Sequence, residues 1–164
     1  MTANVSGGFT LSSNLVFAIP AGANVLTAYN VPIQPNANYS YTPGTGANQM
    51  NKGYQASGNA AAAPVSIDLT TVVCVDGSTG LAHVRELLIF NDDPTHTLNW
   101  DMTIVNSLLG PFTVATKWTI PPLSHARIAN PASAAGWTVD STHKIVDLDP
   151  GANTIAYRLV AGGD

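Results

Sequence analysis

Residues 84–104 read VRELLIFNDDPTHTLNWDMTI, and this stretch decides the fold predicted for the chain. Apolar and polar residues alternate from Leu98 to Ile104, the period of two that marks a strand with one buried face. Residues 87–90 are apolar at every position, as in a strand covered on both faces. Because residues 91–97 between these runs are dense in turn formers, the sequence predicts an antiparallel β-hairpin here.

Further strands are expected along the rest of the chain. Runs rich in β-branched and aromatic residues recur about every 8–12 residues, with Gly, Pro, Asn or Asp turns between them. The expected strands are residues 65–75, 112–120, 123–128, 137–139, 144–148 and 154–160. No run has a convincing helical period. The pattern predicts an all-β fold with an antiparallel core of the β-sandwich or jelly-roll type.

Charge divides the chain into two parts. Lys52 is the only Lys, Arg, Asp or Glu among residues 1–67, and the other 15 of the 16 charged residues follow. Residues 32–64 are rich in Pro, Gly, Asn and Ala and show little periodicity, so they are not expected to order alone. We therefore predict an extended, charge-poor N-terminal arm over residues 1–64 and a β-sandwich domain over residues 65–164.

Two interpretations of the arm are open. It is either a disordered terminal tail or a segment that orders on a neighbouring protein. Within it, strands are expected at residues 14–20 and 25–31. The near absence of charge and the spaced aromatic residues favour the second interpretation, since tyrosine supplies large contact area at low entropic cost. The expected contact residues are Phe17, Tyr29, Tyr39, Tyr41 and Tyr54. Deleting residues 1–62 is then expected to leave the sandwich folded.

Composition argues against several classes of partner. Charged residues make up 10% of the chain, against about 25% in a typical globular protein. The net charge of −4 and the six scattered Lys and Arg residues argue against nucleic acid binding. No membrane span is expected, because no apolar run reaches about 18 residues. No secretory signal is recognisable in residues 1–10, and Cys74 is the only cysteine, so no disulfide within the chain is expected.

Catalytic chemistry is not expected. Glu86 is the only glutamate, and a glycosidase needs two carboxylates across a cleft. Most aspartates lie at turns, where Asp is common for local reasons. Ser124 and His125 are adjacent but lack the context of a nucleophile elbow. The sequence therefore predicts that the protein is not an enzyme.

Metal binding has little support in the sequence. Residues 147–149 place two carboxylates on one strand face, and residues 91–93 supply oxygen ligands in a loop. Neither has the spacing of a defined calcium loop. The four histidines are dispersed and lack paired ligand spacing. No metal or other cofactor is expected.

The tryptophans allow an alternative function. Trp100 and Trp118 continue apolar alternating faces and are expected in the core, whereas Trp137 follows a glycine at a strand start and is less constrained. An exposed Trp137 together with the polar loop after residue 91 would suit carbohydrate or a host surface. The residues of this alternative ligand site are Asp92, Asp93, His96 and Trp137.

Two segments carry a family resemblance. Residues 66–70 (SIDLT) with residues 84–91, and residues 136–139 (GWTV) with residues 151–162 (GANTIAYRLVAG), resemble the decoration or cement proteins of tailed-bacteriophage heads. The resemblance covers residues 65–164 and implies a β-sandwich without an active site. It also implies a homo-oligomer, most often a trimer, that is made in the host cytoplasm and binds the major capsid protein on the virion capsid surface.

Overall fold

The computed structural model describes residues 8–9, 15–19, 29–33, 39–42, 44–130 and 136–164. Regular structure in these residues consists of β-strands, which confirms the prediction of an all-β protein. None of them forms a helix with the length and hydropathy needed to cross a membrane. The chain divides into two compact units, one of residues 7–41 and one that contains residues 42–164.

The smaller unit contains two short antiparallel pairs. Strand β1 (Gly8–Phe9) pairs with β4 (Tyr39–Ser40), and β2 (Leu15–Ile19) pairs with β3 (Tyr29–Ile33). The predicted strand at residues 14–20 corresponds to β2. The predicted strand at residues 25–31 overlaps β3, and its first four residues lie outside the described part of the chain.

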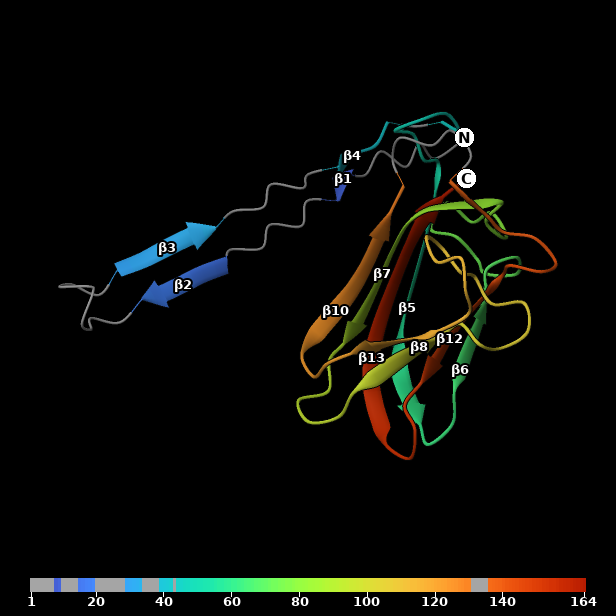
Figure 1. Cartoon of the computed structure of the whole chain (residues 1–164). Helices are drawn as coiled ribbons and strands as arrows, with labels where there is room; N and C mark the ends of the chain where they lie inside the picture. Colours follow the sequence, from blue (N-terminus) through green and yellow to red (C-terminus); the bar gives the residue numbers. More distant parts are fainter. Residues whose placement is uncertain (1–7, 10–14, 20–28, 34–38, 43, 131–135) are drawn as a thin grey trace. The chain divides into compact units, whose positions relative to one another are not determined.

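The larger unit contains two antiparallel sheets (Figure 1). In the first sheet the strand order is β10-β7-β13-β5, and β11 also pairs with β7. Its strands are β5 (Lys52–Ala61), β7 (His83–Asn91), β10 (Ser124–Ala129), β11 (Trp137–Thr138) and β13 (Thr154–Gly163). The second sheet has the order β6-β12-β8-β9. Its strands are β6 (Val65–Asp68), β8 (Leu98–Asp101), β9 (Lys117–Ile120) and β12 (Ile145–Asp149).

One cluster of buried side chains joins the two sheets. Leu87 and Leu159 come from the first sheet, and Trp100 and Leu148 come from the second. All four are at most 1% exposed. Strand β7 is buried along almost its whole length, as its uninterrupted apolar run predicts. The core therefore owes its apolar area to the alternating strand β13, to the buried apolar residues of β8 and β12, and to the continuous run of β7.

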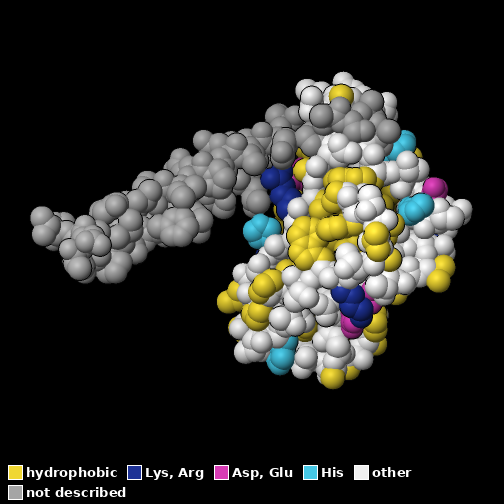
Figure 2. Space-filling view, in the orientation of Figure 1, with side chains coloured by type: hydrophobic (Ala, Val, Ile, Leu, Met, Phe, Trp, Pro, Cys, Tyr) yellow, Lys and Arg dark blue, Asp and Glu magenta, His cyan; other side chains and the backbone are white. Residues whose placement is uncertain are grey.

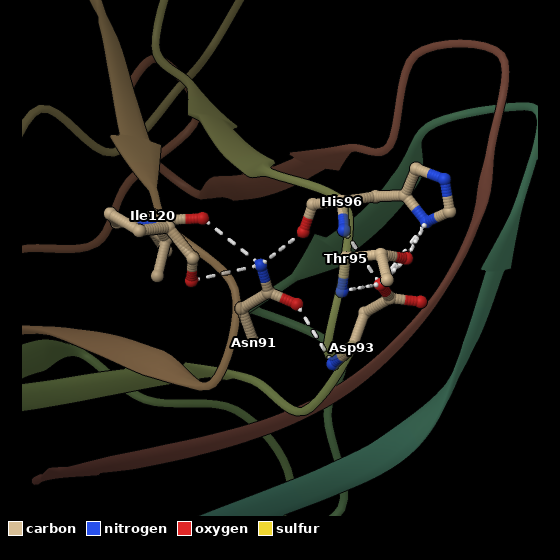
Figure 3. A network of polar contacts seen from close by, with 6 residues as sticks. Asn91, Asp93, Thr95, His96 and Ile120 are labelled. Atoms are coloured by element: carbon tan, nitrogen blue, oxygen red, sulfur yellow. Dashed lines mark hydrogen bonds and ion pairs between the residues drawn. The ribbon is translucent and has the colours of Figure 1, made fainter.

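The predicted hairpin of residues 84–104 is wrong in its pairing. Strand β7 pairs with β10 and β13, whereas β8 pairs with β9 and β12, so residues 91–97 cross from one sheet to the other. The buried Asn91 holds this crossing (Figure 3). Its amide nitrogen donates to His96 O at 2.8 Å, to Ile120 O at 3.0 Å and to Pro121 O at 3.1 Å. One side chain thus ties together the β7–β8 and β9–β10 connections.

The predicted arm of residues 1–64 also needs correction. Strand β5 pairs with β13 over ten residues and belongs to the first sheet. Tyr54 and Ala56 pack against the core and Ala60 is fully buried, while Gln55 and Ser57 are exposed. This alternation was present in the sequence, but it consists of small residues with low strand propensity.

Two other predicted strands are shorter in the structure. The strand expected at residues 65–75 ends at Asp68 in β6, and the one expected at residues 112–120 is regular only in β9, from Lys117. Residues 69–75 and 112–116 lie in turns and loops instead, where Val73, Val75 and Val114 are exposed. The predicted strands were too long because β-branched residues, which are typical of strands, also occur in these loops.

Candidate functional site

The predicted ligand loop has its carboxylates engaged in local structure. Asp93 Oδ1 accepts the backbone N–H groups of Thr95 at 2.8 Å and His96 at 2.7 Å, and the Thr95 hydroxyl at 3.0 Å (Figure 3). These hydrogen bonds, led by the one from the Thr95 backbone, lower the pKa of Asp93 to about 2. The carboxylate is ionised at neutral pH, and its Oδ1 stabilises the turn.

Asp92 is engaged by a cation. Arg158 on β13 donates to both carboxylate oxygens of Asp92, at 2.7 and 2.8 Å. The hydrogen bond from Arg158 lowers the pKa of Asp92. The guanidinium also lies 4.5 Å from the centroid of the Phe90 ring. Asp92 is therefore part of a charged pair on the sheet surface rather than a free ligand.

The same turn occurs a second time in the chain. Asp140 Oδ1 accepts the backbone N–H groups of Thr142 at 2.7 Å and His143 at 2.9 Å, as Asp93 does for Thr95 and His96. Hydrogen bonds led by that from the Thr142 hydroxyl lower the pKa of Asp140 to about 2. The sequence signal is the repeated pattern Asp-x-Thr-His at residues 93–96 and 140–143, which the sequence analysis missed. Its recurrence indicates a turn-forming role.

The structure does not bring Trp137 to the loop of Asp92, Asp93 and His96. Trp137 pairs with Val84 near the first residue of β7, whereas that loop follows Asn91 at the last. Seven residues of extended chain separate Val84 from Asn91, on the order of 23 Å. The alternative ligand site is therefore not assembled as predicted.

Trp137 instead lines a groove of about 280 Å³. The lining residues are Leu108, Leu109, Gly110, Phe112, Gly136, Trp137, Thr138 and His143. Trp137 is partly buried against the core, and His143 is exposed. This volume lies just below the range of about 300–1,000 Å³ that is common for small-molecule sites. An aromatic wall with one imidazole suits the stacking of a small ring.

The tryptophans in the core are only partly as predicted. Trp100 is 1% exposed, which confirms its predicted place. Trp118 is partly buried and stacks on Trp100 with ring centroids 6.1 Å apart. Phe112 meets both rings edge-on, at 6.1 Å from Trp100 and 5.3 Å from Trp118. Trp118 thus covers the core at its margin.

Residues 147–149, considered for calcium, contribute to a carboxylate cluster centred on a lysine. Lys117 Nζ lies 2.7 Å from Asp101 Oδ2 and 3.0 Å from Asp149 Oδ2. The third carboxylate, Asp147, is buried and accepts a hydrogen bond from the Ser66 hydroxyl. Burial raises the pKa of Asp147, and the hydrogen bond that Lys117 donates to Asp101 raises the pKa of Lys117. Among the described residues, no group of three or more His, Cys, Asp and Glu is placed to hold a metal ion.

Two further polar groups lie inside the first sheet. Glu86, the only glutamate, is fully buried and accepts a hydrogen bond from Arg127 Nε at 2.7 Å. Arg85 is also fully buried and donates to Asp164 Oδ2 at 2.8 Å, and His83 Nδ1 lies 2.6 Å from Asp164 Oδ1. This second group was not predicted from the sequence. Its signal was the Arg85–Glu86 pair directly before the apolar run of residues 87–90.

The five predicted contact residues of the arm fall in different parts of the structure. Phe17 lies in β2, Tyr29 in β3 and Tyr39 in β4, all within the smaller unit. Tyr41 is 4% exposed. Tyr54 lies in β5 and packs against the core, and burial raises its pKa. The placement of Tyr54 in the larger unit removes it from the arm.

Comparison with known proteins adds no relative. No family model, no curated protein sequence and no solved structure matches this chain. Functional inference therefore depends on the geometry described above.

Proposed function

We propose that this protein is a structural component of a bacteriophage virion, a decoration or cement protein with a jelly-roll-like β-sandwich. In this proposal it forms a homo-oligomer, most simply a trimer, on the capsid surface. Its N-terminal unit contacts the major capsid protein of neighbouring capsomers. It acts by burial of surface and by strand addition rather than by chemistry.

The observation that carries the proposal is the pairing of β2 with β3. The two strands form a two-stranded sheet within residues 7–41, which make up the smaller of the two compact units. Residues 7–41 contain no Lys, Arg, Asp or Glu. An isolated two-stranded hairpin is marginally stable in water, so it gains stability when an apolar surface covers it. Such a segment suits a contact made on assembly.

Sedimentation with shells tests this function. The full chain is expected to sediment with empty shells assembled from the major capsid protein encoded in the same genome. A variant that lacks residues 1–40 should bind those shells at least tenfold more weakly. Trp137→Ala, a matched change in the larger unit, should bind like the full chain. If the full chain does not sediment with the shells, the decoration function is wrong; equal binding by the truncated chain would exclude the proposed role of the arm.

The groove at Trp137 favours a second candidate function, recognition of carbohydrate or of a host surface. Binding on a glycan array should then be lost in Trp137→Ala. His96→Ala should leave it unchanged, because the loop of His96 is distant from the groove. Loss of binding in His96→Ala, or retention in Trp137→Ala, would contradict a site in this groove.

A further inference from the structure

One edge of strand β5 pairs with no other strand among the described residues. Strand β5 is the last strand in the order β10-β7-β13-β5 and pairs with β13 on one side (Figure 1). Ala62 N donates to Asn153 O on the β13 side, whereas Gly53 O accepts from Val75 N on the other side. Because backbone groups alternate in direction along a strand, the N–H and C=O groups of Gln55, Ser57, Asn59 and Ala61 point away from β13. All four of these residues are exposed.

This edge lacks the features that keep other sheet edges apart. The second sheet ends in β6 and β9, each of four residues, which carry Asp68 and Lys117. At the opposite edge of the first sheet, β10 carries Arg127. Strand β5 has ten residues, and after Lys52 none of them is charged. Natural proteins protect edge strands by shortness, charge and proline, and β5 has none of these over residues 53–61.

We propose that β5 pairs antiparallel with β5 of a second copy of the chain, about a two-fold axis at Gly58. Residues 55–61 are available for this pairing, because Gly53 is already in contact with Val75 and β5 ends at Ala61. Gly58 is the centre of this stretch. In this register Ser57 of each copy lies opposite Asn59 of the other, so small polar side chains meet. On the order of eight backbone hydrogen bonds can form. A two-fold axis at Gly58 brings the residues next to it close to their own counterparts, and a neutral strand avoids like-charge repulsion there.

The proposal concerns two copies in solution and does not depend on the proposed virion function. If both hold, the β5 contact would join copies that belong to different trimers. The alternative occupants of the edge are another segment of the same chain and a strand of an unrelated protein. The experiments below distinguish them from a second copy.

Gly58→Cys tests the register. A two-fold axis at residue 58 brings the two Cα atoms to about 4.5 Å as a non-hydrogen-bonded pair, within the range for a disulfide. A Cβ at residue 58 would approach the Tyr157 ring no closer than 3.5 Å, an ordinary contact, so the fold should tolerate it. We expect disulfide-linked dimers on mild oxidation, whereas Ser141→Cys in an exposed turn should give few. A folded Gly58→Cys protein that stays unlinked would overturn the proposal.

Ser57→Pro tests the pairing itself. It removes an outward N–H group, and proline is tolerated on the solvent side of an edge strand. We expect an unchanged melting temperature and at least a tenfold weaker self-association by analytical ultracentrifugation. Unchanged self-association would overturn the proposal. So would slow hydrogen exchange at the Ser57 and Asn59 amides in a species with the mass of one chain, because another segment of that chain would then occupy the edge.

Discussion

Replacing Trp100 with alanine is expected to lower the free energy of unfolding by about 3–5 kcal/mol. Trp100 is 1% exposed, and its ring stacks on Trp118 and meets Phe112 edge-on. An alanine there loses the burial of the indole and leaves a cavity that strands β8, β9 and β12 cannot close, because their register is set by pairing. Urea unfolding followed by circular dichroism measures the loss.

Trp118 and Trp137 serve as matched controls for this substitution. Both side chains are partly buried at the margin of the core. Their alanine variants should therefore lose clearly less stability than Trp100→Ala. The sequence alone placed both Trp100 and Trp118 in the core, since both continue alternating faces. If the three losses prove equal and small, Trp100 does not occupy the centre of the core as described.

Strand positions could be predicted from the sequence better than strand partners. The alternation in residues 154–160 identified β13, because one buried face imposes a period of two. Turn formers in residues 91–97 marked a connection but carried no information on whether the flanking strands share a sheet. That choice depends on Asn91 and the carbonyl groups of Ile120 and Pro121, about thirty residues further along. Such non-local contacts leave no local signal.

The candidate site shows the same limit. Asp92, Asp93 and His96 are correctly recognised as residues of a loop, but their engagement by Arg158 and by backbone N–H groups is tertiary detail. Trp137 was correctly singled out as less constrained than Trp100. Its separation from the loop follows from the pairing of β11 with the first residues of β7, which no pattern in two residues of sequence could indicate.

Whether an N-terminally truncated chain folds should depend on whether it retains strand β5. A chain that lacks residues 1–40 should fold with a melting temperature close to that of the full chain, because both sheets of the larger unit remain. A chain that lacks residues 1–62 should fail to fold cooperatively. This reverses the expectation from the charge boundary, which placed residues 52–61 in the arm.

The chain that lacks residues 1–62 is expected to lose stability for two reasons. The ladder between β5 and β13 covers ten residues, and its net contribution is about 0.5–1.5 kcal/mol per hydrogen bond. Removing β5 also uncovers the buried Ile155 and Leu159 of the neighbouring strand and deletes Ala60 from the core. Together these losses approach the total stability of a small protein, about 5–15 kcal/mol.

Thermal melting of the two truncated chains tests whether β5 is required for folding. Near-ultraviolet circular dichroism reports on the packing around the tryptophans. The variant that lacks residues 1–40 is the control, because it shortens the N-terminus without touching β5. Loss of cooperative melting in the control would mean that the smaller unit supports the larger one. A cooperative transition at the full-chain temperature after deletion of residues 1–62 would mean that β13 tolerates an open edge. The folded unit would then begin at residue 65, as the charge pattern first indicated.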